Sequence, residues 1–280
     1  MHFVSDFFCL GKCFYEGNEI ITRNKGEIGM EKNKKWLKDM LKKYSLSDLY
    51  KEDEYGEYYN ELRQIYDEFN LKRKRLQKLI KKYTHMINVI QVNNDYFIKG
   101  RVKNKEHLII KILRECKEKG KTIADIHMKN YISYFKDIIG IRVVCINQDD
   151  KILFLKKLID SDLINISNVR FYTCNNAKAN VYANEIKNSK GLKYDIKIRD
   201  EKIPYDCIHV YALAEEENIT FEIQIRTFFE EAWGEVDHTL KYPYSMDDDF
   251  LKEQMSILFS VSEVADKIIT SVYNHKNRKK

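Results

Sequence analysis

The sequence has few of the residues that break regular secondary structure. Its 280 residues include ten glycines and two prolines, whereas average usage would give about 20 and about 14 at this length. So few breakers exclude collagen-like, mucin-like and linker-rich chains, and they disfavour an all-β sandwich with many tight turns. Hydrophobic residues make up 44% of the chain, which is enough for a buried core. We therefore expect long helices joined by short connections.

Features of membrane and secreted proteins are also missing. No run of about 18 apolar residues could span a bilayer, and the first residues lack the basic stretch and long apolar run of a signal peptide. Six cysteines are spread along the chain, and only Cys9 and Cys13 lie close together. No second pair completes a zinc site. The sequence therefore predicts a cytoplasmic protein with reduced cysteines.

The first third of the chain divides into two regions. Residues 1–29 show no clear period and are expected to form a loose extension, with Met30 as an alternative start of translation. Residues 30–90 are predicted to be helical. Residues 48–68 carry eight acids and two bases, and residues 72–82 carry seven bases and no acid. Across this change of charge runs one apolar stripe at helical spacing: Leu62, Ile65, Tyr66, Phe69, Leu76, Ile80, Tyr83 and Ile87. We expect a long helix with one face on a core, and docking to an anionic partner or a sister subunit is the alternative.

Residues 91–243 are predicted to form the main domain, because helical and strand-like segments alternate there. Helices are expected at 105–119, 123–136, 151–163 and 228–240, and strands at 140–147, 167–173, 192–198, 206–213 and 219–226. Several strands follow one another directly, so the predicted fold is α+β, with a mixed sheet of about five strands flanked by helices. Residues 244–280 are predicted to form a C-terminal helix with a basic tail.

Basic residues are concentrated just before the predicted sheet. Residues 99–121 carry nine bases and three acids, an excess equal to the net charge of +6 of the whole chain. Arg101 and Lys103 alternate in an extended segment, which places them on one side, and Lys111 follows on a helix. Guanidinium and ammonium groups neutralise closely spaced phosphate oxygens. A phosphate site is one interpretation, and a solvated charged face is the other.

Two strand segments carry polar residues that point to a site. Asp137 precedes the strand at 140–147, and Arg142 inside that apolar strand needs a partner or must face a cleft. The strand at 219–226 alternates strictly, with Glu222, Gln224 and Arg226 on one face. Asp137 and Glu222 are candidate ligands of Mg²⁺, which takes oxygen ligands and substrate phosphates. A turn aspartate and a solvated sheet face are the alternatives.

The remaining candidates flank these strands. Tyr205 and His209 lie at the start of the strand at 206–213, and the Tyr205 ring could stack on a nucleobase or pack in the core. In the helix at 228–240, Glu235 and His238 lie opposite the apolar face that contains Trp233. Their spacing resembles half of a di-metal carboxylate motif, but the second copy is missing. We therefore expect a polar edge beside the preceding strand.

Taken in order, these motifs resemble the RelA/SpoT synthetase family over about residues 80–243. The matching positions are Arg101, Lys103 and Lys111; Asp137, Gly140 and Arg142; Tyr205 and His209; Glu222, Gln224, Arg226 and Thr227; and Trp233, Glu235 and His238. The chain has no His-Asp dipeptide, which marks the hydrolase domain of that family. It therefore resembles the single-domain small alarmone synthetases.

The resemblance implies a nucleotidyltransferase-like sheet and a reaction. That reaction transfers the β,γ-pyrophosphate of ATP to the 3′-hydroxyl of GDP or GTP with Mg²⁺, and makes the stringent-response alarmone (p)ppGpp. It implies ATP binding by Arg101, Lys103, Lys111 and Arg142, catalysis and metal binding by Asp137 and Glu222, and acceptor binding by Tyr205, His209, Gln224, Arg226, Glu235 and His238. A homo-oligomer, typically a tetramer, is also implied.

Two other functions stay open at this point. The first is a toxin-like relative that pyrophosphorylates the 3′ end of tRNA, in which basic residues 72–82 and the basic C-terminal tail would hold RNA phosphates. The second is a catalytically idle module that binds nucleotide or RNA. The chain departs from the family pattern at His107-Leu108, where Ser-Ile is usual, and at Ile203-Pro204, where Asn-Gly or similar is usual. The acceptor is therefore less firmly specified than the donor.

Overall fold

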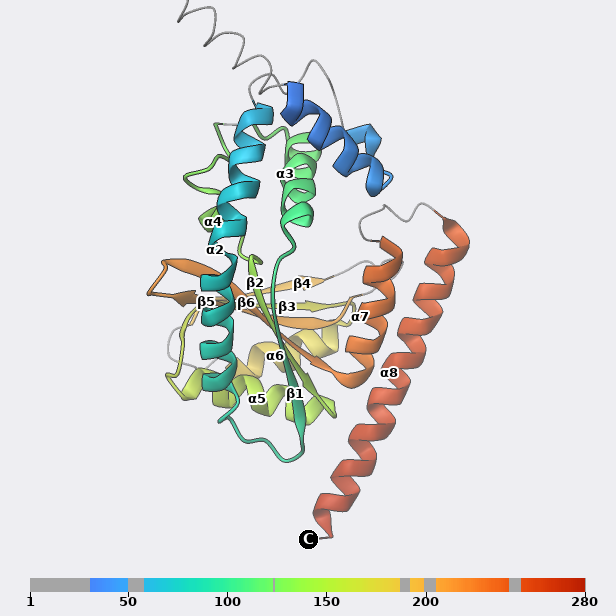
Figure 1. Ribbon diagram of the computed structural model, residues 1–280. Coiled ribbons are helices and arrows are strands. Elements are labelled where there is room, and N and C mark those ends of the chain that lie inside the picture. Colours follow the sequence, from blue (N-terminus) through green and yellow to red (C-terminus); the bar gives the residue numbers. More distant parts are fainter. Residues whose placement is uncertain are drawn as a thin grey trace, which may run out of the picture. The chain divides into compact units, whose positions relative to one another are not determined.

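The computed structural model describes residues 31–49, 58–122, 124–186, 192–198, 205–241 and 248–279. The predicted loose extension and the Ile203-Pro204 departure lie outside these residues. The chain divides into two compact units, a smaller one of Met1–Asp67 and Ile109–Met128 and a larger one of Glu68–Leu108 and Lys129–Lys280. Helices α2 (Tyr58–Ile87) and α3 (Lys105–Lys119) each have residues in both units (Figure 1).

The described part of the smaller unit is largely helical. Residues 31–43 are helical, and the 3₁₀ helix η1 (Ser47–Leu49) follows. Leu37, Leu62 and Ile65 are fully buried, so this part of the predicted stripe on α2 does face a core. The positive φ of Gly120, +61°, ends α3 one residue after its last helical turn.

The larger unit is built on a six-stranded mixed sheet in the order β1-β2-β6-β5-β3-β4. Its strands are β1 (Tyr96–Val102), β2 (Ile139–Cys145), β3 (Asn165–Thr173), β4 (Tyr194–Ile198), β5 (Cys207–Ala214) and β6 (Ile219–Thr227). The pairs β2–β6 and β3–β4 are parallel, and the other three are antiparallel. This confirms the predicted fold class. The strand beyond the expected five is β1, which lies at the edge of the sheet and therefore lacks a buried apolar run.

The two faces of the sheet differ in chemistry. One face is apolar and carries fully buried side chains such as Ile141, Ile223 and Phe171. Helices α2, α5 (Gln148–Asp160) and α6 (Asn176–Ile186) pack on this face. Their ring contacts are Tyr83 of α2 with Phe221, Phe154 of α5 with Tyr96, and Tyr182 of α6 with Phe171, with centroids 4.6 to 5.0 Å apart. The opposite face is polar and is left to the site described below.

The prediction of a helix at 123–136 is wrong for most of that range. Of the described residues there, only α4 (Tyr131–Tyr134) is helical. The Asp125 carboxylate accepts hydrogen bonds from the Thr122 backbone N–H (2.9 Å) and hydroxyl (3.1 Å). Such side-chain bonds offer the backbone an alternative to the helix. The helix expected at 151–163 begins earlier, at Gln148, because the Asn147 side chain caps it by accepting from the Asp150 N–H.

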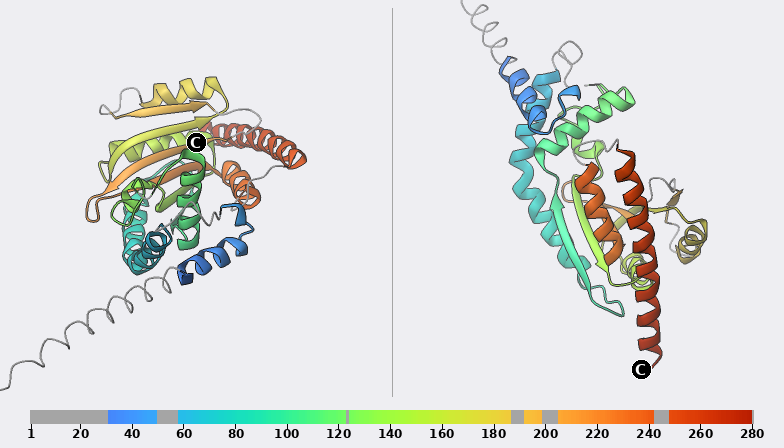
Figure 2. Two further views of the ribbon diagram at one scale, coloured as in Figure 1. Left: turned by 90° about the horizontal axis from the view of Figure 1, so that it is seen from above. Right: turned by 90° about the vertical axis from the view of Figure 1, so that its right-hand side faces the viewer.

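Helices α7 (Phe228–Lys241) and α8 (Asp249–Arg278) close the larger unit beside the sheet (Figure 2). Trp233 of α7 packs edge-on against Phe259 of α8, and its indole N–H donates to the Met255 carbonyl at 3.0 Å. In the described part of the chain, no helix is both long and apolar enough to cross a membrane.

A buried ionic cluster lies where α5, α6, α7 and α8 approach one another, and we call it the lysine cluster. The fully buried Lys151 ammonium donates to both Glu230 carboxylate oxygens at 2.7 and 2.8 Å and to Asp206 at 3.2 Å. Burial lowers the pKa of Lys151, but the charges of Asp206 and Glu230 raise it more, so the net pKa lies well above the usual value. The lysine therefore stays protonated.

Candidate active site

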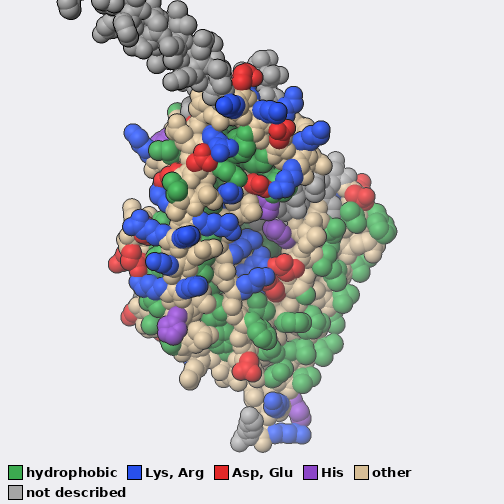
Figure 3. All heavy atoms as spheres, in the orientation of Figure 1, with side chains coloured by type: hydrophobic (Ala, Val, Ile, Leu, Met, Phe, Trp, Pro, Cys, Tyr) green, Lys and Arg blue, Asp and Glu red, His purple; other side chains and the backbone are tan. Residues whose placement is uncertain are grey.

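The polar face of the sheet carries one continuous row of charged and polar side chains. Residues paired directly across neighbouring strands point to the same face. The register from β1 to β4 therefore places these residues side by side: Lys99, Arg142, Gln224, His209, Arg170 and Asp195. Figure 3 shows basic, acidic and histidine side chains gathered over β1 and beside α7. The alternation predicted for residues 219–226 is thus confirmed.

A hydrogen-bonded chain runs through the centre of this face. The His209 Nδ1 lies 2.5 Å from the Glu222 carboxylate, and its Nε2 lies 2.9 Å from the Tyr205 hydroxyl. The same hydroxyl accepts from the Arg226 guanidinium at 2.8 Å. Gln224 donates to the second Glu222 oxygen at 2.8 Å. Glu222, His209 and Arg226 are buried, so each position is fixed by its neighbours.

The charges within this series of hydrogen-bonded side chains set the protonation state of each member. Burial raises the pKa of Glu222, but the His209 charge and the hydrogen bonds from His209 and Gln224 lower it more, so the net pKa is below the usual value. Burial lowers the pKa of His209, but Tyr205 and Glu222 raise it more, and the net pKa lies well above 6.5. At neutral pH the pair is therefore an imidazolium donating to a carboxylate.

Helix α7 supplies acids that hold the two arginines of the strands. Arg142 donates to Glu231 at 2.8 Å and also pairs with Glu235. Arg226 donates to the other Glu231 oxygen at 3.2 Å. The Arg226 guanidinium lies so close to Gly234 that a Cβ there would overlap it, so the glycine makes room for the arginine. Arg142 thus has the partners that an arginine in an apolar strand requires.

Asp137, together with Arg101 and Lys103 of the basic residues 99–121, lies at the β1 edge of the same face. The Lys103 ammonium is 2.9 Å from the Asp137 carboxylate, whose side chain is 24% exposed. The Asp137 charge raises the pKa of Glu222, so the two acids lie in one electrostatic environment. Burial first, then the charges of Lys103 and His238, lower the pKa of His107 to about 4. Burial first, then Arg101 and Arg142, also lower the pKa of His238, so both imidazoles are neutral beside the cations.

No ready metal cluster is visible in the described ranges, since nowhere do three or more His, Cys, Asp or Glu side chains group to hold an ion. Asp137 is paired with Lys103, and both Glu222 oxygens accept from His209 and Gln224. Mg²⁺, however, is often held by one or two carboxylates together with substrate phosphates. Two neighbouring acids, one of them partly exposed, fit that mode and not an all-protein cage.

Most of the predicted site residues come together in the larger unit. The polar face and its edges gather these residues: Arg101, Lys103, Asp137, Arg142, Tyr205, His209, Glu222, Gln224, Arg226, Glu235 and His238. Lys111 differs, because it lies on the part of α3 that belongs to the smaller unit. Its role stays a prediction.

Sequence reasoning missed the polar side chains of β3. Arg170 donates to Asp195 of β4 at 2.6 Å and lies over the Tyr211 ring, and the Tyr172 ring is edge-on to His209 at 4.6 Å. These residues extend the site toward β4. The signal was present, because Arg170 and Tyr172 alternate with buried Val169 and Phe171.

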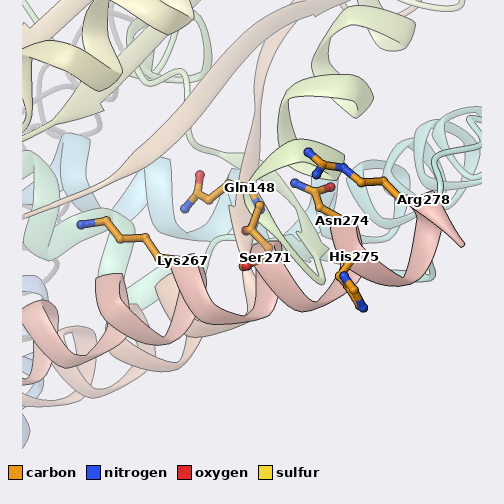
Figure 4. Close-up of a pocket in the computed structure, with 7 residues that line it drawn as sticks. Gln148, Lys267, Ser271, Asn274, His275 and Arg278 are labelled. Atoms are coloured by element: carbon orange, nitrogen blue, oxygen red, sulfur yellow. The ribbon is translucent and has the colours of Figure 1, made fainter.

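A separate groove lies along α8 and is lined by none of the predicted site residues. Its volume is about 480 Å³, and its lining comes from one side of α8 and from the first residue of α5 (Figure 4): Gln148, Lys267, Thr270, Ser271, Asn274, His275 and Arg278. The polar face of the sheet therefore remains the candidate active site.

Comparisons with known proteins identify the family and the fold. Residues 100–247 match the family described as the region found in RelA / SpoT proteins. A search of curated proteins gave no match. Among solved structures, the small alarmone synthetase 1 from Bacillus subtilis aligns at 19% identity and a TM-score of 0.52, over 74% of this chain and 94% of that chain. The same synthetase bound to its product pppGpp aligns at 18% identity and 0.49, over 72% and 93%.

A GTP pyrophosphokinase family protein from Streptococcus pneumoniae aligns at 21% identity with a TM-score of 0.47, over 80% of this chain and 95% of that chain. Identities this low speak for the fold alone. The first of these alignments, at a TM-score of 0.52, supports the same mixed sheet flanked by helices.

Proposed function

Because the chain belongs to the family of the region found in RelA / SpoT proteins, we propose that it is an ATP-dependent GTP/GDP pyrophosphokinase. In this proposal the β,γ-pyrophosphate of ATP moves to the 3′-hydroxyl of GDP or GTP, and AMP leaves. The observation that carries the proposal is the polar sheet face, where an ionised, hydrogen-bonded Glu222 and the Lys103–Asp137 pair lie in one electrostatic environment. Family membership supports this class of activity, and the geometry supplies the roles of the residues.

The donor phosphates are assigned to the basic edge of the site. Arg101 and Lys103 lie on and just after β1, and Arg142 follows on the neighbouring strand. Phosphoryl-type transfer depends on positioning and on neutralising charge, with no covalent protein group required. The neutral His107 and His238 leave the cationic groups as the charges that face the phosphates. We assign Lys111 to the same role on the sequence motif alone.

Mg²⁺ is assigned to the two carboxylates of this edge, Asp137 and Glu222. When bound, the ion would neutralise the oxygens of the transferred group. Asp137 is the more accessible of the two and would hold the ion, which would leave the Lys103 ammonium available to a phosphate oxygen. Glu222 is held ionised by His209 and Gln224, which suits a second ligand or an acceptor for the proton of the attacking hydroxyl.

The acceptor is assigned to the other side of Glu222. The Tyr205 ring is fixed by the bonds of its hydroxyl to His209 and Arg226 and by edge contact with Tyr172 at 5.4 Å. A ring held in this way is a preorganised stacking surface for a base. The Gln224 Oε1 is buried, and within the described residues it has no hydrogen-bond partner. It is therefore ready to accept from a guanine N–H.

The basic stretch of α2, which would serve a tRNA acceptor, is partly neutralised by its own surroundings. Lys72 pairs with Glu68, Arg75 with Glu217 and Lys82 with Glu216. These ion pairs favour a helix that is solvated on one face and packed on a core with the other. We therefore place nucleotide acceptors ahead of tRNA.

The test is a transfer assay with purified full-length protein, Mg²⁺ and γ-labelled ATP, in parallel with GDP, GTP and bulk tRNA. We expect label in a guanosine tetra- or pentaphosphate and none on tRNA. Label on tRNA would overturn the acceptor assignment. Transfer to none of the three would overturn the enzyme assignment in favour of a binding module. Omission of Mg²⁺ and the Asp137→Asn variant serve as controls.

A further inference from the structure

Cys207 is the first residue of β5, and its side chain is fully buried. A buried cysteine usually acts as a small apolar packing residue. The Cys207 sulfur, however, accepts a hydrogen bond from the Arg226 Nε at 3.2 Å. Packing alone does not account for a charged donor that is directed at the sulfur.

The Arg226 guanidinium is held at all three of its nitrogen atoms, each by a different side chain. The Nε donates to the Cys207 sulfur at 3.2 Å, one Nη donates to Glu231 at 3.2 Å, and the other donates to the Tyr205 hydroxyl at 2.8 Å. A guanidinium is planar and rigid, so three fixed nitrogen atoms define both its position and its plane. Loss of the Nε contact would free the plane to turn about the line through the two Nη atoms.

Tyr205 and Cys207 lie on the same side of their segment. Asp206 between them points to the other side, where its carboxylate accepts from Lys178 at 2.8 Å, as expected for an extended chain in which side chains alternate. Cys207 belongs to β5, whereas Tyr205 precedes that strand. Arg226 therefore links a ring outside the sheet to a sulfur whose backbone is fixed within the sheet.

Charges around the sulfur strengthen this contact. Burial raises the pKa of the Cys207 thiol, but the charges of Arg226 and then His209 lower it more, so the net pKa is below the usual value. Burial lowers the pKa of Arg226, but the charges of Cys207 and then Tyr205 raise it more. Hydrogen bonds that involve ionised groups are stronger than neutral ones. The sulfur is therefore a firm anchor for the guanidinium.

We propose that Cys207 is a positioning residue for the acceptor: its sulfur orients the Arg226 guanidinium, and Arg226 fixes the Tyr205 ring on which the acceptor base stacks. The inference rests on the proposed function, because that function assigns Tyr205 to the acceptor. Cys207 itself contacts neither substrate and takes no part in the transfer. A ring that is already ordered costs less to bind against, so the contact acts on acceptor binding and leaves ATP binding unchanged.

The first test compares steady-state kinetics of the full-length wild type and variants with ATP and either GDP or GTP. Cys207→Ala should raise the acceptor KM by about tenfold and leave kcat and the ATP KM within about twofold, since one charged hydrogen bond is lost. Cys207→Ser should recover most of the loss, because a hydroxyl oxygen also accepts from the Nε. Cys145→Ala is the matched control, since Cys145 is equally buried in β2 and should leave all three constants unchanged.

Two kinetic outcomes would overturn the inference and leave the proposed function intact, because the wild type would still transfer label. One is an equal rise in the acceptor and ATP KM of Cys207→Ala. The other is a Cys207→Ser variant that is no better than Cys207→Ala.

The second test does not depend on turnover. In nitrogen-15-labelled protein, the Arg226 Nε–H signal is assigned by its loss in Arg226→Lys, and its exchange with solvent is measured by NMR. Exchange should be faster by about tenfold or more in Cys207→Ala and close to wild type in Cys207→Ser. Unchanged exchange in Cys207→Ala would overturn the contact. A wild type that transfers no label would overturn the proposed function and with it the acceptor role, whereas this signal reports on the contact alone.

Discussion

Two charged clusters lie within the larger unit, and they differ in what their polar atoms leave open. In the lysine cluster, one ammonium is fully buried and is closed off by Glu230, Asp206 and the Tyr182 hydroxyl. The candidate active site contains similar ion pairs, but the Asp137 side chain at its edge is partly exposed. The buried Gln224 Oε1 also has no hydrogen-bond partner among the described residues. Buried charge alone therefore does not identify a site, whereas access and spare hydrogen-bonding capacity do.

The same comparison explains what each cluster does. Buried ion pairs give little net stability, but removal of one partner leaves an uncompensated charge. The lysine cluster joins four helices and is predicted to fix their positions. The candidate active site is predicted to hold two acids and several cations ready for phosphates and a metal ion.

The largest effect is expected for the acids of the candidate active site. Asp137→Asn or Glu222→Gln should lower kcat by about a thousandfold or more, because each removes a charge that positions the metal and the reacting groups. Steady-state transfer of labelled pyrophosphate measures the effect. The melting temperature of Asp137→Asn should stay within a few degrees of wild type, since this side chain is partly exposed. Near wild-type turnover in either variant would remove these residues from the site.

The next largest effect is expected when the lysine cluster is disrupted. Lys151→Met should destabilise the fold by about 3–5 kcal/mol, because it leaves the Glu230 carboxylate buried without its cation and leaves Asp206 with Lys178 alone. Lys157→Met is the matched control, since Lys157 is exposed on the same helix. Denaturant unfolding gives the free energies. Protein that is still folded should retain its turnover, and a large loss of turnover without a loss of stability would contradict the division between the clusters.

A smaller effect is expected at Gly234, which leaves room for the Arg226 guanidinium of the candidate active site. A Cβ at this position overlaps the Arg226 guanidinium, so Gly234→Ala should displace that group from Tyr205 and lower kcat/KM by about tenfold. The double variant Gly234→Ala/Arg226→Lys tests whether the loss in kcat/KM is caused by displacement of Arg226. If the effect passes through Arg226, the double variant should lose little more than Arg226→Lys alone, whereas additive losses would indicate a separate cause.

A further effect is a pH dependence of stability from Asp266, at the margin of the lysine cluster. Burial first, and then the Glu230 charge, raise the pKa of Asp266 to about 7 from an ordinary value of 3.8. Between these values the folded state keeps a proton that the unfolded state has lost. This contribution to stability therefore falls as pH rises from about 4 to about 7, and it is constant above that range.

Each unit of pKa difference corresponds to about 1.4 kcal/mol, so the change is on the order of a few kcal/mol. Asp266→Asn should flatten the difference between unfolding free energies measured at pH 5 and pH 7.5. An unchanged difference in the variant would assign the pH dependence to other groups.

Local patterns predicted the parts of the fold that depend on local physics. The stripe on α2, the bounds of α3 and the alternation of β6 all appear as expected, because burial of one face imposes a period on the sequence. The helix expected at 123–136 failed where the side-chain bonds of Thr122 and Asp125 compete with it. Strand β1 was described only as an extended segment, because an edge strand needs no apolar run.

The candidate site was predictable where motifs mark it and unpredictable where only pairing does. Arg142 was singled out by its place in an apolar strand, Asp137 by its place just before that strand, and Glu222 by the alternation of its own strand. The Glu231 bridge between Arg142 and Arg226, the His209 contact with Glu222 and the space that Gly234 leaves depend on strands and a helix far apart in the sequence.

By itself, the sequence determined the mixed sheet with its helices, the residues that resemble the RelA/SpoT family and the concentration of basic charge in 99–121. The tertiary structure decided which charges meet. It closed Lys151 among acids that the sequence does not single out, and it turned one side of α8 outward. The reason is physical: periodicity and composition follow from local burial, whereas ion pairing and exposure follow from which elements the folded chain brings together.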